Sequence, residues 1–160
     1  MALINNKQTD FQKLAICISV PLLIGFIGAL FTTPAIPSWY AGLNKPVFSP
    51  PNWIFGPVWT LLYVLMGVSL YIAWQKELSR KSAVLFSAQL FLNLMWSVIF
   101  FGMKSPLYAF FEIILLWAAI LLTILDFRKV SKNAALLLIP YIVWVSFAAI
   151  LNFYIWVLNQ

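Results

Sequence analysis

The side chains of this 160-residue chain that could do chemistry are mostly indoles and amides. The chain has no histidine and one cysteine, Cys17, so it lacks the commonest general base and metal ligand and cannot close a disulfide within itself. It does contain eight tryptophans, whose flat faces and N–H donors suit a large planar aromatic ligand. We therefore expect no metal site, no tightly bound cofactor and no hydrolytic catalytic group, and we expect any site to be built from aromatic rings.

One acidic residue, Glu112, lies inside a long apolar stretch. A carboxyl group in such a place can be linked to a proton, form an ion pair with Lys45 or Lys104, or stay neutral in apolar surroundings. We favour a structural or interfacial role for Glu112.

Composition indicates where these residues lie. The chain is 64% hydrophobic and 9% charged, with a mean hydropathy of +0.96, and a soluble domain of this size could not bury so much apolar surface. The net charge of +6 comes in short clusters between apolar runs, which is typical of membrane topology signals and not of a nucleic-acid interface. The clusters leave five stretches, each long enough for one helix of about 20 residues. We predict one domain, residues 1–160, that is an all-α integral membrane bundle of five transmembrane helices, with spans at 14–32, 55–74, 83–101, 106–125 and 135–157.

The basic residues predict the orientation of these spans. Cytoplasmic loops carry an excess of lysine and arginine. With the N-terminus inside and the C-terminus outside, the outer side holds only Lys45 and Lys104. The inner side then holds Lys7, Lys13, Lys76, Arg80, Lys81, Arg128, Lys129 and Lys132.

The first connection, residues 33–54, is longer than the others and holds five of the nine prolines. Proline density stiffens a segment, and a long ordered loop among short ones is often a lid over a binding site. Its aromatic residues could instead form a belt at the level of the lipid headgroups. We favour the lid.

Helical spacing gathers aromatic and polar residues in the outer half of the spans, under this loop. Trp59 and Tyr63 share one face of the second span, as Asn93, Trp96 and Phe100 do on the third. Trp144 lies near the middle of the fifth span. We predict a pocket among these three spans and expect the Asn93 amide to face it.

Two other features have two interpretations each. Gln89 and Asn152 are polar residues inside spans, and they either line the pocket or bond helices together. The first span has a face of small residues, for which we favour close helix packing over ligand contact. This face consists of Pro21, Gly25, Gly28 and Thr32.

Several motifs resemble the TspO/MBR family, which comprises translocator proteins (peripheral-type benzodiazepine receptors) and bacterial tryptophan-rich sensory proteins. The resemblance runs from about residue 14 to 157, with the motifs in the same order and spacing. The motifs are WYAGLNKP at 39–46, SPPNWIF at 49–55, WTLLYVLMG at 59–67, QLFLNLMW at 89–96 and PYIVW at 140–144.

This resemblance implies a homodimer in a bacterial cell membrane that binds porphyrins such as protoporphyrin IX, and benzodiazepine-like drugs. It also implies a role in tetrapyrrole regulation or stress response. Because the chain has no histidine for axial ligation, we expect a metal-free tetrapyrrole as ligand or substrate. The implied ligand-binding residues are Tyr40, Trp59, Asn93, Trp96, Trp144 and Ala148, to which the shared face of the second span adds Tyr63.

Alternative functions stay open. Some bacterial members of the family resemble photochemical enzymes that degrade bound porphyrin, and Trp59 and Trp144 are then the candidate catalytic residues. A tetrapyrrole or small-molecule transporter is a weaker alternative, because five spans do not divide into two equal repeats. Sterol binding is disfavoured, since no lysine or arginine follows Lys132 to complete the motif of animal members in the last span.

Overall fold

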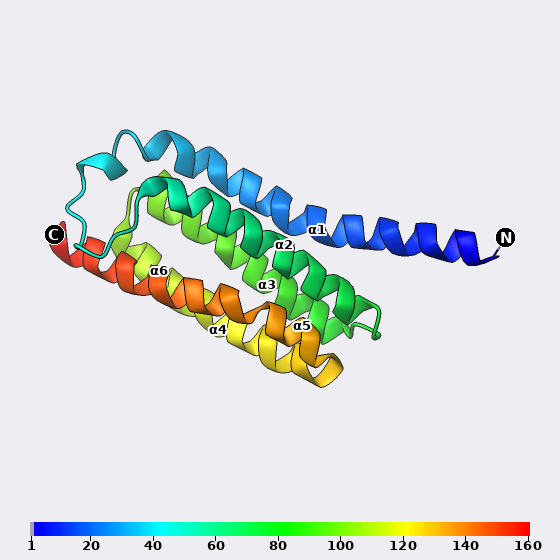
Figure 1. Ribbon diagram of the computed structural model, residues 1–160. Helices are drawn as coiled ribbons and strands as arrows, with labels where there is room; N and C mark the ends of the chain where they lie inside the picture. The colour runs from blue at the N-terminus through cyan, green and yellow to red at the C-terminus, as the bar shows by residue number, and fades with distance from the viewer. Residues whose placement is uncertain (1) are drawn as a thin grey trace.

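The protein folds as a bundle of long helices that run side by side (Figure 1). The computed structural model describes residues 2–160, with side chains from Asp10 onward. Over residues 2–160 there is no strand, and five helical segments are long and apolar enough to cross a membrane, which confirms the predicted fold class. These spans are formed by α1 (Ala2–Ala35), α2 (Phe55–Trp74), α3 (Arg80–Ser97), α4 (Pro106–Val130), and α5 (Lys132–Leu137) together with α6 (Ile139–Leu158).

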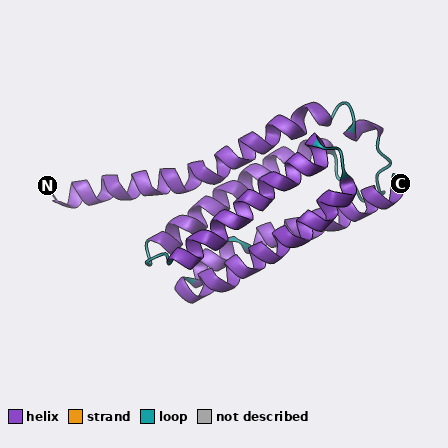
Figure 2. Ribbon diagram, turned by 180° about the vertical axis from the view of Figure 1, so that it is seen from behind, coloured by secondary structure: helices purple, strands orange, loops and turns teal. Residues whose placement is uncertain are grey.

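The first helix is longer than the predicted span 14–32. At 34 residues, α1 measures about 51 Å by the helical rise, against about 30 Å for the hydrocarbon of a bilayer. Its N-terminal part extends past the other helices, as the front and rear views show (Figures 1 and 2). Farther along, α1 packs on α2 at Gly67, where an added Cβ atom would lie 2.5 Å from the Cα atom of Ile18. Glycine permits this close approach of two backbones because it has no side chain.

The connection between α1 and α2 crosses one end of the bundle. Because α1 continues to Ala35, the connection is shorter than the predicted loop 33–54, and we call residues 36–54 the lid segment. It contains two short 3-10 turns, η1 (Tyr40–Gly42) and η2 (Asn52–Ile54). Two hydrogen bonds of 2.9 Å attach it to the C-terminal end of α6: the Asn44 N–H donates to Asn159 Oδ1, and Asn159 Nδ2 donates to the Asn44 carbonyl. We call this end of the bundle the lid end.

The opposite end is held by contacts between α3 and α4. Ser79 caps α3 by accepting a 3.0 Å hydrogen bond from the Ser82 N–H, and the Ser82 hydroxyl donates to Asp126 of α4 at 2.6 Å. One step farther in, Phe86 and Phe127 stack with ring centroids 5.9 Å apart. These contacts fix the alignment of α3 with α4.

The fifth span, predicted over 135–157 with Pro140 inside it, consists of two helices. α5 ends at Leu137 and α6 begins at Ile139. The cause is Pro140, which has no N–H to bond the carbonyl four residues earlier and whose ring would collide with that carbonyl. The break lets α5 pack on α2 while α6 follows α4. α2 therefore stays close to α5 but has few backbone contacts with α6, and side chains occupy the space between α2 and α6 at the lid end.

Candidate ligand-binding site

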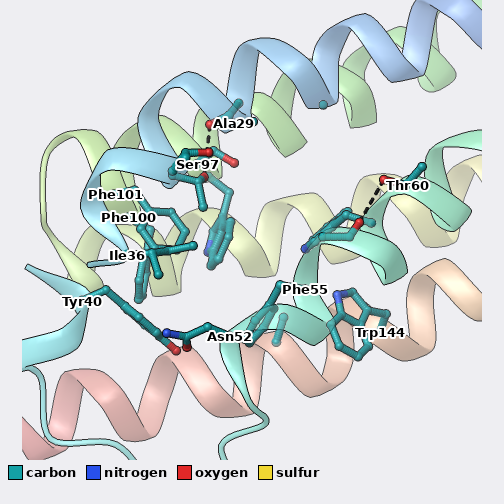
Figure 3. Close-up of a pocket in the computed structure, with 18 of the residues that line it drawn as sticks. Ala29, Ile36, Tyr40, Asn52, Phe55, Thr60, Ser97, Phe100, Phe101 and Trp144 are labelled. Atoms are coloured by element: carbon teal, nitrogen blue, oxygen red, sulfur yellow. Dashed lines mark hydrogen bonds between the residues drawn. The ribbon is translucent and has the colours of Figure 1, made fainter. Parts of the chain in front are cut away.

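A cavity of about 410 Å³ lies at the lid end of the bundle. Its walls come from α1, the lid segment, α2, the C-terminal end of α3 and α6, and we call it the aromatic cavity (Figure 3). Six of the seven predicted ligand-binding residues line it. They are Tyr40, Trp59, Tyr63, Trp96, Trp144 and Ala148.

One wall of the cavity is built at the end of α3. Trp96 stacks on Phe100 with ring centroids 5.1 Å apart, and Phe101 meets Trp96 edge-on at 5.9 Å. Both phenylalanines belong to a π-helical turn, η3 (Val98–Gly102), in which the Met103 N–H bonds the Val98 carbonyl at 2.8 Å. A π turn brings residues i and i+5 into line, so Phe101 as well as Phe100 reaches Trp96. The sequence did not identify Phe101, because ordinary helical spacing places only Phe100 on that face.

The opposite wall comes from α2 and α6. Phe55 meets Trp144 edge-on with centroids 6.0 Å apart, and Trp59 stacks on Tyr63 at 5.6 Å. The close-up shows Phe55 beside Trp144, away from the group formed by Tyr40, Phe100 and Phe101 (Figure 3). Aromatic side chains thus face the cavity from two sides, and a flat apolar guest can stack on such faces.

The indole N–H groups of this cavity are not equivalent. Trp96 Nε1 donates to Asn152 Oδ1 at 3.0 Å, and Asn152 Nδ2 donates to the Pro106 carbonyl at 2.7 Å. Asn152 thus lines the cavity and also joins α3, α6 and the start of α4, so both of its predicted roles apply. In contrast, Trp144 Nε1 is buried and has no hydrogen-bond partner among the described residues. Because buried polar groups normally pair, the Trp144 N–H is a donor in the cavity wall whose hydrogen-bonding capacity is unused among the described residues.

Asn93 is the predicted ligand-binding residue that does not line the cavity. Its Oδ1 accepts a 2.6 Å hydrogen bond from the Tyr63 hydroxyl, and its Nδ2 donates to the Tyr141 hydroxyl at 3.1 Å. Asn93 is 3% exposed and lies behind Tyr63. Its amide is already paired by two tyrosines from other helices, so it positions the Tyr63 ring at the cavity and offers no group of its own.

The first span also contributes a wall of the cavity, although we favoured close helix packing over ligand contact for its small residues. Gly25 and Gly28 line the cavity, and both also allow close packing. A Cβ atom at Gly25 would overlap the Tyr63 ring, and one at Gly28 would lie 3.2 Å from the Ser97 hydroxyl. Thr32, whose hydroxyl donates to the Gly28 carbonyl, completes this face. The small residues thus bring α1 near the rings and leave space beside them.

The lid segment closes the cavity with Tyr40, which is 4% exposed. Lys45 Nζ lies 4.7 Å from the centre of the Tyr40 ring, a cation–π distance. Burial raises the pKa of the Tyr40 hydroxyl, an effect partly offset by the nearby Ser49 hydroxyl. The Tyr40 hydroxyl is therefore an uncharged donor at neutral pH.

Two buried polar residues in the spans stand apart from this site. Glu112 is 7% exposed, and neither of its carboxyl oxygens has a hydrogen-bond partner among the described residues. Among the described residues Glu112 forms no ion pair with Lys45 or Lys104, so the ion-pair role is excluded there. Gln89 is 1% exposed and likewise lies outside the cavity lining. Among the described residues no group of three histidine, cysteine or acidic side chains could hold a metal ion.

The sequence pattern of the TspO/MBR family matches residues 17–157. The chain belongs to this family. It is 49% identical to the tryptophan-rich protein TspO of Chlorobaculum tepidum over 158 residues, which cover 96% of this chain and 99% of that protein. It is 40% identical to the translocator protein of Homo sapiens over 142 residues, which cover 85% of this chain and 83% of that protein. It is 36% identical to the tryptophan-rich sensory protein of Cereibacter sphaeroides over 129 residues, or 79% of this chain and 82% of that protein.

Membership of the TspO/MBR family confirms the resemblance seen in the motifs. The protein is thus a membrane protein of the translocator and sensory-protein family, with five apolar helices. Its bacterial relatives are consistent with a location in a cell membrane.

Proposed function

We propose that this protein is a membrane receptor or sensor that binds metal-free porphyrins of the protoporphyrin IX type, and benzodiazepine-like drugs, in the aromatic cavity. Such binding would serve tetrapyrrole regulation or a stress response. The observation that carries the proposal is the pair of aromatic walls with the unpaired, buried Trp144 N–H beside them. Aromatic faces stack on a planar ligand, and a buried donor fixes the position of an acceptor. The volume of about 410 Å³ falls within the range of about 300–1,000 Å³ typical of small-molecule sites.

The lid segment carries a positive charge that favours an acidic ligand. Lys45 is held over the Tyr40 ring, and Tyr40 lines the cavity. Its ammonium group therefore lies at the roof of the site, where it can attract a carboxylate such as a porphyrin side chain carries. A neutral drug would use the aromatic walls and the Trp144 donor without this contact.

The setting of this receptor is also part of the proposal. The excess of lysine and arginine supports an orientation with the N-terminus on the inner side of a bacterial cell membrane and the lid end on the outer side. We propose that the chain acts there as a homodimer. The orientation is tested with single cysteines in the lid segment and a membrane-impermeable thiol reagent added to intact cells. Labelling only from the inner side would show that the orientation is the opposite one.

The receptor function is tested by titrating the bilayer-reconstituted protein with protoporphyrin IX in the dark and following tryptophan quenching. We expect saturable quenching in the unaltered protein and a lower affinity for protoporphyrin IX in Trp59→Ala and Trp144→Ala. The matched control is Trp117→Ala, because Trp117 lies outside the cavity lining and donates to Ser146 between α4 and α6. Quenching without saturation, or equal affinity in all four proteins, would rule out the receptor.

A second candidate is light-dependent degradation of the bound porphyrin. The observation that favours it is the aromatic path that leads away from the cavity: Trp59 stacks on Tyr63 and meets Tyr141 edge-on at 6.2 Å. Illuminated turnover should then require Trp59 and Trp144 beyond their contribution to affinity. If free porphyrin bleaches under the same light as fast as bound porphyrin, the enzyme hypothesis fails while the receptor hypothesis stands.

A further inference from the structure

We infer that ligands reach the aromatic cavity sideways from the lipid, through an opening between α1 and α2 that we call the lateral portal. This inference rests on the proposed function, because it concerns the route of a planar aromatic ligand that is dissolved in the membrane. The portal is bordered by Phe26 and Ala29 of α1 and by Gly56 and Thr60 of α2, all of which line the cavity.

The bordering residues are exposed as well as cavity-lining. Phe26 is 66% exposed, and Ala29, Gly56 and Thr60 are also exposed. A Cβ atom added to Gly56 would meet no atom within 4 Å, so α1 leaves the beginning of α2 uncovered. The labelled Ala29 and Thr60 belong to the two helices on either side of this opening (Figure 3).

The opening is confined to the lid end because α1 and α2 close on each other deeper in the bundle. At Gly67 the two backbones approach so closely that only glycine fits. Nearer the lid, Gly25 lies directly against the Tyr63 ring. Beyond that contact the pair separates, so the cavity has a closed floor and an open side.

Its depth places the portal in the hydrocarbon of the membrane. Thr60 is eight residues from Asn52, the first residue of a 23-residue candidate span, and so lies about 12 Å from the end of that span. Phe26 is nine residues from Ala35, which puts it at a similar depth of about 14 Å. The span measures about 34 Å against about 30 Å of hydrocarbon, so both residues lie below the headgroups.

The rim of the portal is also apolar in character. The Thr60 hydroxyl donates to the Gly56 carbonyl at 2.9 Å, and this satisfies its polar atom within α2. Phe26 supplies a ring that can turn about its own side-chain bonds. Rotation of such an exposed side chain takes picoseconds to nanoseconds and would widen the portal without moving the backbone.

The route beneath the lid segment is restricted by hydrogen bonds that hold this segment to the end of α6. Two hydrogen bonds of 2.9 Å join Asn44 to Asn159, and Asn44 Nδ2 also donates to the Leu158 carbonyl at 3.4 Å. Tyr40 is buried under Lys45 behind this attachment. A ligand that came from the water would have to break these contacts and move the backbone of the lid segment.

A reversible plug at Thr60 tests the portal. Thr60→Cys is nearly isosteric, and Cys17 is fully buried, so a bulky membrane-permeable methanethiosulfonate should label position 60 alone. Protoporphyrin IX is mixed with the protein in lipid nanodiscs before labelling, after labelling, and after release of the label with a reductant. We expect the label to slow both association and dissociation by about tenfold or more, and the reductant to restore both rates.

The controls separate the portal from the lid and from the proposed function. Leu61→Cys, carrying the same label, should change neither rate by more than about twofold, since Leu61 is 59% exposed but does not line the cavity. Asn159→Ala should likewise leave both rates unchanged. If the association and dissociation rates did not change with the label at position 60 but rose in Asn159→Ala, ligands would enter beneath the lid segment and the portal would be wrong. The proposed receptor function would still stand. Absence of saturable binding in the unlabelled proteins would overturn the proposed function and the portal together.

Discussion

Replacing Gly67 by alanine should push α1 away from α2 and destabilise the bundle. The added Cβ atom would lie 2.5 Å from Ile18 Cα and 2.8 Å from the Cys17 carbonyl oxygen. Ordinary van der Waals contact begins near 3.4 Å, so the α1 backbone would have to withdraw by about 1 Å. Backbone atoms cannot rotate aside as a side chain can, and the helix must therefore move as a unit.

The size of this effect follows from two opposing contributions. Overpacking of a well-packed interface costs about 1–3 kcal/mol, whereas alanine gains up to about 1 kcal/mol over glycine in helix propensity. We expect a net loss of about 1–2 kcal/mol in the free energy of unfolding. Gly56→Ala on the same helix should lose nothing, because its Cβ atom meets no neighbour within 4 Å.

The assay is reversible unfolding in mixed micelles with rising dodecyl sulfate, followed by helical circular dichroism. Comparing the two alanine variants isolates the overpacking cost, since both gain helix propensity. If Gly67→Ala were as stable as Gly56→Ala, the close approach of α1 and α2 would be wrong. The closed floor of the lateral portal would then lose its physical basis.

Three other substitutions probe the supports of the cavity. Tyr63→Phe leaves Asn93 Oδ1 without its 2.6 Å donor and should cost about 1–3 kcal/mol in the same unfolding assay, and a neutral result would contradict the buried network. Asn152→Leu removes the acceptor of Trp96 Nε1, so the indole N–H resonance of Trp96 should move toward that of an unbonded indole, and an unchanged resonance would exclude the bond. Pro140→Ala should let α5 and α6 merge, which would be seen as slowed hydrogen exchange of the new amide at position 140. Rapid exchange there would show that the break has another cause.

The five spans could be predicted from the sequence because membrane helices are specified by the lengths of apolar runs. The charges that separate those runs do not, however, mark where a helix ends. α1 continues past its first charged residues because a charged side chain does not by itself end a helix in water. The fifth span breaks because the ring of Pro140 would collide with the turn before it. Pro21 lies within α1 without such a break, so the presence of a proline alone did not decide the outcome.

The candidate site could be predicted as far as helical periodicity reaches. Periodicity placed Trp59 with Tyr63 and Trp96 with Phe100, and the structure shows both pairs stacked. Periodicity could not show that the Asn93 amide is hydrogen-bonded to two tyrosines, because one of them, Tyr141, is 48 residues away in sequence.

Two lining elements had no clear sequence signal. Phe101 joins the wall through a π turn, and that turn depends on hydrogen bonds beyond the end of α3. The small residues of α1 serve packing and cavity at once, and a pattern of glycines cannot separate these roles. Gly25 illustrates the point, since it contacts the ring of Tyr63 and borders the space beside it.

The most direct test of the central claim is the dissociation constant for protoporphyrin IX, measured in the dark from porphyrin absorbance, in Trp144→Phe and Trp117→Phe. Phenylalanine keeps an aromatic face at position 144 and removes the N–H that has no partner among the described residues. An ordinary hydrogen bond contributes about 0.5–1.5 kcal/mol net, so Trp144→Phe should weaken binding by roughly twofold to tenfold, while Trp117→Phe binds as the unaltered protein does. Equal affinity in the two variants would contradict the assignment of the aromatic cavity as the porphyrin site.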